Sequence, residues 1–404
     1  MGIFGTTQKR ERSVLLCTVE SGAVHATLCL IHPNSKPFIV HSVSKSIPFH
    51  ERLIFDRFAS ATLQALADAC QEITIKGIPH IASRHVRHGH IDSVHCAYGS
   101  PWYVSQTHHI DVVLPNESVV TKKTILDLLE RNSAKTRLAL ADKHDRAKVL
   151  QQDIIDVRLN GYSVDNPYGK KADRISFSVT TGILSESLSL YMEDVVGRFF
   201  GYKQITHHAE PSILFFGIRD TLATDTSFLA LDISAEVTDI SLVRNGILSE
   251  TLSFPFGVRT AIRQFSQKSR VIASEVLGIM QGLKNKKLDS TISKKYETYA
   301  SYVRSAWKSS ATQALIPTLE ESPLPKTALL FGNSGEFTRI KDILLPTEIP
   351  HPTTGEVIPT TLVIAEQISH FCVVRAGVRL LNPLIPFFAL YIHRFLTMKN
   401  NNSL

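Results

Sequence analysis

The fold is constrained most by one stretch, FLALDISAEVTDISLVRNGILSETLSFPFG, which begins at Phe228. Its first apolar run ends on an acidic residue, Asp232, and a short turn of mostly small residues follows. A second apolar run ends near Asn245-Gly246, a dipeptide that favours a two-residue hairpin because both central positions need positive φ. A third run returns from that turn. The pattern therefore predicts three consecutive strands joined by an acidic turn and an Asn-Gly turn.

This stretch resembles the second phosphate motif of actin-like ATPases, most of all the version in the bacterial cell-division protein FtsA and its pilus relative PilM. In that family an aspartate holds a metal-bound water, and glycines let backbone N–H groups approach the nucleotide phosphates. Asp232, Thr238 and Gly257 occupy matching places. Ser234 and Glu236 stand where glycines are expected, and Glu236 adds a negative charge beside the place of a polyanion. The resemblance thus implies a phosphate hairpin with damaged phosphate contacts.

A second hairpin of this kind is predicted near the N-terminus, where two strands flank a turn at Glu20-Ser21-Gly22. Its place is that of the first phosphate hairpin of the family, which usually carries Asp-x-Gly-Ser/Thr. Thr18 replaces the aspartate and Glu20 replaces the glycine, although a shifted alignment would let Glu20 act as the acid. Two phosphate hairpins have therefore lost their characteristic residues in one chain.

A third motif, TALLFGNSGEFTRI, resembles the adenosine motif of the family, in which glycines pass beneath the base or ribose and a helix begins beside it. ATP and Mg²⁺ are the cofactors that the resemblance implies, with weak or lost binding, and Asp232 is the candidate metal ligand. The candidate nucleotide-binding residues are Glu20, Ser21, Gly22, Asp232, Ser234, Thr238, Gly257, Gly332, Ser334 and Gly335.

A small extra subdomain distinguishes FtsA and PilM from actin, and two phrases of this chain resemble it. VTKKTILDLLERN matches its opening, where Thr121 is expected to cap a helix. The later phrase DIIDVRLNGYSVDNPYGKKADRISFSVTTGI carries an Asn-Pro-x-Gly bend at Asn166, Pro167 and Gly169. A generic α/β insertion is the alternative interpretation. We favour the family interpretation because motifs occur on both sides of this segment in family order.

The resemblance implies an α/β fold: a two-lobed actin-like (ribonuclease H-like) ATPase fold with an FtsA-type small α+β subdomain inserted in the first lobe. A chain of 404 residues is long enough for two lobes or more. The expected parts are a tail at 1–12, lobe 1 at 13–117 and 184–224, the inserted subdomain at 118–183, the lobe 2 core at 225–258 and 325–381, a helical subdomain at 259–324, and a C-terminal helix and tail at 382–404.

Composition limits the compartment and the partners. Five cysteines without a CxxC spacing favour a reducing cytoplasm over a disulfide scaffold. The net charge of +7 allows attraction to anionic lipids but is too small and dispersed to indicate nucleic acid. Five lysines between 284 and 295 form a basic patch that could meet an acidic partner or lipid, and a solvated helical face is the favoured interpretation.

A histidine-rich stretch offers a second candidate metal site. Imidazole and thiolate ligands suit zinc or another transition metal, but the spacings match no closed tetrahedral pattern. An exposed loop between a helix and a strand is therefore the favoured interpretation. The residues concerned are His80, His85, His88, His90, His95 and Cys96.

The C-terminal segment 384–396 shows an apolar helical stripe. FtsA ends in an amphipathic helix that lies in the inner leaflet, and this segment could lie at a membrane surface in the same way. Ile385, Ala389 and Leu390 make the opposite face apolar too, and a helix that is apolar all round is often buried. Both interpretations remain open at the level of sequence.

The expected function is that of an FtsA-like scaffold at the cytoplasmic face of the membrane, peripheral to it, which links a cell-division machine to the membrane. Its partners would be proteins of a division or pilus machine, with self-association as a further expectation. The alternatives are a PilM-like pilus assembly platform protein and an active actin-like ATPase. The ATPase alternative requires that Glu20 reaches a metal and that Glu236 points away from the phosphates.

Overall fold

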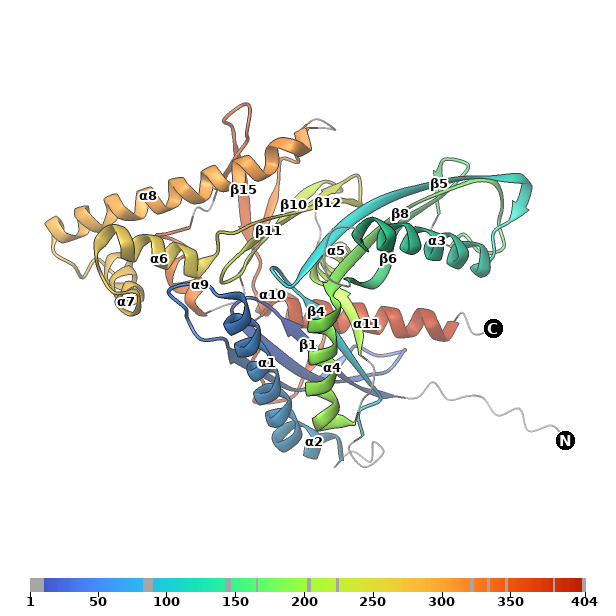
Figure 1. Cartoon of the computed structure of the whole chain (residues 1–404), viewed down its shortest axis with the longest axis horizontal. Coiled ribbons are helices and arrows are strands. Elements are labelled where there is room, and N and C mark those ends of the chain that lie inside the picture. Colours follow the sequence, from blue (N-terminus) through green and yellow to red (C-terminus); the bar gives the residue numbers. More distant parts are fainter. Residues whose placement is uncertain are drawn as a thin grey trace.

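The computed structural model describes residues 11–82, 90–141, 147–164, 166–201, 205–222, 225–319, 323–332, 335–345, 348–380 and 382–401. Within these residues the chain forms two lobes, each built on a six-stranded mixed sheet, and a subdomain with a four-stranded sheet projects from the first lobe (Figure 1). The two-lobed α/β architecture predicted from the sequence is confirmed.

The first lobe has a sheet with helices on both faces, in the strand order β16-β3-β2-β1-β4-β9. Its elements are β1 (Arg12–Val19), β2 (Ala23–Ile31), β3 (Phe38–Ser46), α1 (Phe55–Glu72), the π-helix η1 (Ile73–Gly77), α2 (Ile78–Ala82), β4 (Ser93–Tyr98), α4 (Glu186–Phe200), β9 (Thr206–Ala209), α5 (Glu210–Thr221) and β16 (Val373–Val374). Alternate residues of β1 enter different cores. Leu15 and Cys17 join the core under α1 and α4, whereas Val14 and Leu16 join the core that contains α5.

The second lobe contains the three strands expected around the Asn-Gly turn, in a sheet of order β12-β11-β10-β13-β15-β14. Its strands are β10 (Phe228–Ile233), β11 (Thr238–Arg244), β12 (Ile247–Phe254), β13 (Ala328–Gly332), β14 (Glu348–Pro350) and β15 (Val357–Leu362). Asn245 and Gly246 have φ values of 51° and 76°, as such a turn requires. Its helices are α6 (Val258–Ser269), α7 (Ala273–Lys284), α8 (Ser290–Leu315), the 3₁₀ turn η3 (Ile316–Leu319), α9 (Gly335–Ile340) and α10 (Ala365–Ser369).

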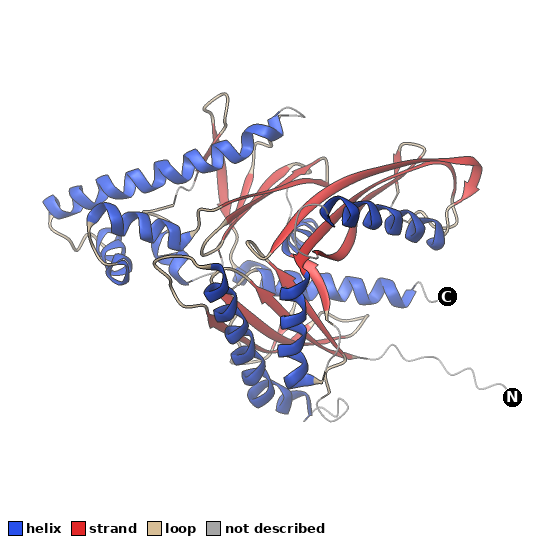
Figure 2. Cartoon of the chain, viewed as in Figure 1, coloured by secondary structure: helices blue, strands red, loops and turns tan. Residues whose placement is uncertain are grey.

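The inserted subdomain places helix α3 against one face of a sheet of order β5-β8-β6-β7 (Figure 2). Its elements are β5 (Tyr103–Val119), α3 (Lys122–Ala141), β6 (Ala147–Leu159), β7 (Tyr162–Ser163) and β8 (Lys171–Ser185). Thr121 caps α3 as predicted, since its Oγ1 accepts from the Thr124 N–H at 3.1 Å. Strand β5 continues directly from the first lobe and begins at Tyr103. The sheet of the subdomain therefore begins well before the phrase VTKKTILDLLERN.

The C-terminal helix α11 (Leu384–Asn401) is part of the core. It packs along α5, and both helices join one apolar cluster with residues of β1 and β2 from the first lobe and of β10 and β13 from the second. Phe387 and Phe388 have no exposed surface. The interpretation of 384–396 as a membrane-surface helix is therefore wrong for this structure, because the stripe that would enter lipid is covered by α5 and both sheets.

Among the described helices, none has the length and apolar character that are needed to cross a bilayer.

Candidate functional site

The two hairpin turns expected to hold phosphates contact each other directly. Ser21, in the turn between β1 and β2, has its Oγ 2.7 Å from the Oγ of Ser234, in the turn between β10 and β11. Ser21 Oγ also accepts from the backbone N–H of Glu236 at 2.9 Å. A Cβ added at Gly22 would lie only 2.8 Å from the Cβ of Ala235. The space between the turns is therefore filled by protein atoms.

The backbone N–H groups at the start of α6 could bind a phosphate, but they already donate hydrogen bonds to the second turn. The N–H groups of Val258 and Arg259, at the start of α6, donate to the carbonyls of Ser234 and Ala235 at 3.0 and 2.7 Å. Gly257 allows this close approach, because a Cβ there would lie 2.5 Å from the Ala235 carbonyl oxygen. The helix N-terminus, which is often an anion site, binds the chain itself.

Four buried carboxyl groups line the region behind the turns. Glu20, Glu210, Asp232 and Asp239 are each at most 7% exposed. Glu210 comes from the start of α5 and lies against Gly99, at the end of β4. These groups converge from both lobes, so the site is strongly acidic where a triphosphate would be expected.

Burial raises the pKa values of Glu210, Asp232 and Asp239, and repulsion by neighbouring carboxyl groups adds to this at Glu210 and Asp232. The pKa of Glu210 lies well above its ordinary value, first because of burial and then because of Asp232, Glu20 and Asp239. The pKa of Asp232 is also raised well above its ordinary value, first by burial and then by the nearby carboxyl groups of Glu20 and Asp239. The cluster therefore holds protons at pH values where isolated carboxyl groups are ionised.

Neutral donors hold the outer members of the cluster. Asn382 Nδ2 donates to Glu20 Oε1 at 2.7 Å. Ser100 Oγ, from the first lobe, donates to Asp239 Oδ1 at 2.7 Å, and Ser253 Oγ donates to the same oxygen at 2.5 Å. His25 Nε2 lies 3.9 Å from Glu20, but burial lowers the pKa of His25 to about 4, so it is neutral near pH 7.

These residues do not fit a nucleoside triphosphate in the arrangement described. Carboxylates suit Mg²⁺, but the phosphates would have to separate two turns that are hydrogen-bonded, and they would meet four acids. Within the described residues no group of three or more His, Cys, Asp or Glu side chains is arranged to hold a metal ion. Asp232 as a metal ligand remains a prediction.

Glu236 points away from the contact between the turns. Its carboxylate forms an ion pair with Arg263 of α6, which also donates to the His50 carbonyl at 3.0 Å and stacks over Phe49. Arg259 donates to the Ile47 carbonyl at 2.8 Å. Two arginines of the second lobe thus bind the segment that follows β3 of the first lobe. These contacts help to hold the two lobes together.

The remaining predicted residues have structural contacts. Thr238 Oγ1 donates to the Phe256 carbonyl at 2.6 Å and accepts from Trp307 Nε1 at 3.2 Å, and it is fully buried. Gly332 ends β13 opposite Ile233, and the ring of Phe337 fills the space above it. Gly335 begins α9, whereas Ser334 lies outside the described residues.

Sequence reasoning missed several residues that complete the site, of which Glu210 is the most important. An acid followed by Pro211 at the start of a helix, directly after a short strand, was the available signal. Asn382 and Ser100 carried no such signal, because they act through contacts with distant parts of the chain. The others are Arg259 and Arg263.

The histidine-rich stretch is only partly described, since His85 and His88 lie outside the described residues. His95 is buried and its Nδ1 lies 3.0 Å from Nε2 of His208, on the neighbouring strand β9. The ring of His208 meets Tyr391 of α11 edge-on. In the part of the chain that the structure covers, these side chains have packing roles.

Solved structures show what this arrangement is similar to. The PilM–PilN type IV pilus biogenesis complex aligns over 96% of this chain and 98% of that chain, with a TM-score of 0.52 at 13% identity. The fold is that of the actin-like ATPases. A Bacteroides thetaiotaomicron protein with an actin-like ATPase fold and unknown function aligns over 90% of this chain and 94% of that chain, with a TM-score of 0.36 at 11% identity.

The ethanolamine utilization protein EutJ from Carboxydothermus hydrogenoformans aligns over 88% of this chain and 86% of that chain, with a TM-score of 0.35 at 10% identity. No family model matches the sequence, and no curated protein matches it. At these identities the likeness establishes the actin-like fold alone, and the finer resemblance to FtsA remains a prediction.

Proposed function

We propose that this chain is an actin-like scaffold in a membrane-associated machine of the pilus or cell-division kind. It acts at the cytoplasmic face of the membrane and hydrolyses ATP slowly or not at all. The observation that carries this proposal is the contact between the two phosphate turns, at Ser21 and Ser234. An actin-like cleft with joined turns serves as a rigid joint between lobes.

The PilM–PilN complex supports a pilus role, because its fold covers nearly the whole of this chain and its printed name describes an assembly with a protein partner. The inserted subdomain supplies a surface for such a partner. A cavity of about 220 Å³ lies where this subdomain meets α5 and α11. Phe216, Tyr391 and Phe395 line it, with Asp153 and Arg394 beside them. This mixture suits an extended segment with an apolar anchor.

Titration calorimetry with Mg²⁺-ATP tests the loss of nucleotide function. We expect no measurable binding at micromolar concentrations and no turnover above background. A variant in which Ser21, Ser234 and Glu236 are all replaced by glycine removes the serine hydrogen bonds between the turns and should bind ATP more tightly than the wild type. Micromolar affinity with steady turnover by the wild type would contradict the proposal.

An active ATPase is the second candidate, and two observations favour it. Glu236 points away from the turns, as that hypothesis requires, and Glu210 joins Asp232 as an acid in the cleft. If turnover is detected, Glu210→Gln decides between a native and a contaminating activity. Loss of turnover in this variant would support the enzyme, whereas unchanged turnover would assign the activity to a contaminant.

A photo-crosslinking amino acid tests the partner surface. Placed at Gln152, beside the cavity, it should capture a protein of a pilus or division machine in cells. The same amino acid at Gln281, on the exposed surface of α7, is the matched control. Capture of the same proteins at both positions, or of no such protein at Gln152, would reject this surface.

A further inference from the structure

The outer end of the helical subdomain carries an excess of positive charge. Between positions 284 and 295 there are five lysines and one aspartate, Asp289. Lys284 is paired with Asp342 at 2.6 Å. The other four lysines are exposed, and in the part of the chain that the structure covers no carboxylate lies within salt-bridge distance of them. These are Lys286, Lys287, Lys294 and Lys295.

Asp289 offsets only one of the five positive charges, and its side chain caps α8. Its Oδ1 accepts from the N–H groups of Thr291 and Ile292 at 2.8 and 3.4 Å, and these bonds lower its pKa. Lys294 and Lys295 lie near the N-terminus of α8, where the helix field favours negative side chains, whereas Lys286 and Lys287 follow the C-terminus of α7, where it favours positive ones. The four exposed lysines are therefore accessible to an anionic partner outside the chain.

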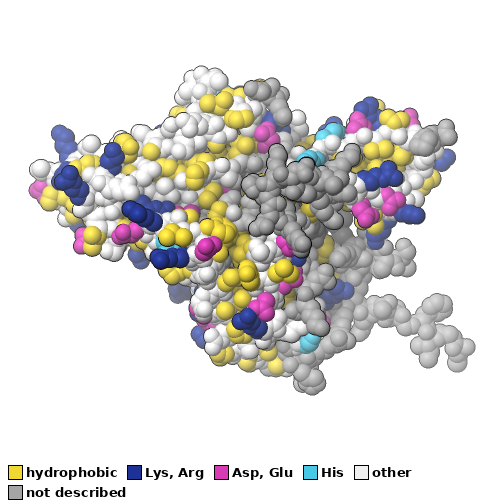
Figure 3. Space-filling view, viewed as in Figure 1, with side chains coloured by type: hydrophobic (Ala, Val, Ile, Leu, Met, Phe, Trp, Pro, Cys, Tyr) yellow, Lys and Arg dark blue, Asp and Glu magenta, His cyan; other side chains and the backbone are white. Residues whose placement is uncertain are grey.

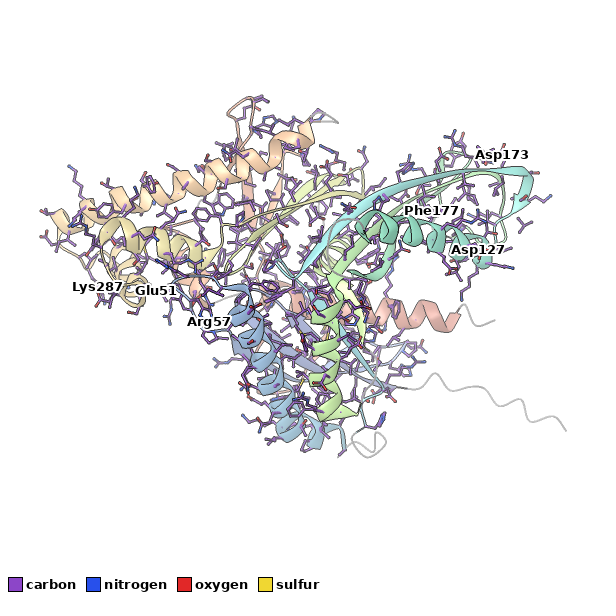
Figure 4. All side chains as sticks on the ribbon, in the orientation of Figure 1. Glu51, Arg57, Asp127, Asp173, Phe177 and Lys287 are labelled. Atoms are coloured by element: carbon purple, nitrogen blue, oxygen red, sulfur yellow. The ribbon has the colours of Figure 1, made fainter. Side chains whose placement is uncertain are left out.

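The lysines lie on a convex tip with one apolar side chain among them. Figure 4 shows Lys287 toward the outer end of the helical subdomain, and Figure 3 shows Lys and Arg side chains at that end, with Asp and Glu side chains among them. Ile292, in the first turn of α8, is 45% exposed. We call the surface of Ile292 and the four exposed lysines the basic tip.

We propose that the basic tip docks on an anionic lipid bilayer. Charge complementarity selects an anionic partner, and a convex tip can approach a plane without colliding with the rest of the molecule. Lysine ammonium groups are mobile point charges suited to lipid headgroups, and Ile292 can enter the interface between them. A single-stranded nucleic acid would favour interleaved aromatic side chains, and the segment 284–295 contains none.

This assignment goes beyond the proposed scaffold function, because it places the membrane contact in the second lobe. The C-terminal helix is buried and cannot make that contact without leaving the core. The membrane contact of the basic tip does not depend on whether the cleft binds nucleotide. If the vesicle experiment fails, the results of the nucleotide and crosslinking experiments are unaffected.

Sedimentation of the full chain with vesicles tests the basic tip. The vesicles contain equal parts of phosphatidylglycerol and phosphatidylcholine, and vesicles of phosphatidylcholine alone serve as the neutral reference. Each lysine near an anionic surface contributes about fivefold to binding. A variant with Glu at positions 286, 287, 294 and 295 should therefore bind about 600-fold more weakly if all four lysines reach the surface, and high salt should release the wild type.

The matched control carries the same change of net charge on the inserted subdomain, with Glu at positions 122, 123, 170 and 171, which are exposed lysines. It should bind the anionic vesicles nearly as well as the wild type. Ile292→Ser should weaken binding a few-fold with an unchanged dependence on salt. Equal losses of binding in the tip variant and the control would overturn the proposal. A wild-type chain that does not bind anionic vesicles would also overturn it, and would indicate an acidic protein partner.

Discussion

Ser21 Oγ lies 2.7 Å from Ser234 Oγ, although 213 residues separate the two serines in the sequence. Each serine stands at the tip of a hairpin, and each hairpin belongs to a different lobe. The same turns also meet through Gly22 and Ala235. This contact joins the two lobes, so residues of both hairpin turns contribute to the stability of their association.

Replacing Ser21 by Ala should loosen this contact. The change removes the partner of Ser234 Oγ and leaves the buried N–H of Glu236 without its acceptor. A buried donor without a partner costs about 1–3 kcal/mol. Urea unfolding should show a loss of this size. Ser35→Ala, in an exposed turn, is the control and should be near neutral. Equal stabilities of the two variants would show that the contact contributes little.

The buried acids should make the fold less stable as the pH rises. Because the pKa values of Glu210 and Asp232 are raised in the folded state, that state holds more protons than the unfolded chain above pH ~4. The free energy of unfolding then falls as the pH increases through this window. Glu210→Gln removes one of these groups, so it should raise the melting temperature at pH 8 and change it little at pH 4.

His25 and His207 have lowered pKa values and affect stability in the opposite direction. Below pH ~6.5 the unfolded chain binds protons at these histidines more readily than the folded chain, so the free energy of unfolding falls as the pH decreases. They are present in both proteins, so they cancel when wild type and variant are compared at each pH. Glu51→Gln, at an exposed position, is the control for loss of a carboxylate. A variant at Glu210 that melts below the wild type at pH 8 would show that Glu210 is ionised and partnered.

Arg263 should be needed mainly to neutralise Glu236. The Arg263→Ala variant leaves the carboxylate of Glu236 buried at 5% exposure without its cation, which typically costs about 3 kcal/mol or more. The double variant with Glu236→Gly should recover much of this loss, because the uncompensated charge is gone. Thermal unfolding of both variants measures the difference. A double variant that is no more stable than Arg263→Ala would place the role of Arg263 in its contacts with residues 49 and 50.

The sequence was informative where local patterns decide structure. The hairpin turn at Asn245-Gly246 and the cap at Thr121 were predicted because turn and cap chemistry involve residues close in the chain. The convergence of Glu210 with Asp232 could not be predicted, because it depends on how α5 enters between the lobes. The burial of α11 was ambiguous for the same reason, since an apolar helix can face lipid or a core.

The packing of α11 on α5 depends on one glycine, and a second helical glycine supplies the control. A Cβ at Gly217 would collide with the ring of Phe387, which is fully buried, so Gly217→Ala should destabilise the fold by about 1–3 kcal/mol. At Gly278 of α7 nothing lies within 4 Å of the added atom, so Gly278→Ala should stabilise by about 0.5–1 kcal/mol. Thermal unfolding should therefore shift in opposite directions. Equal shifts would mean that α11 can move away from α5, and the buried position of the C-terminal helix would then need revision.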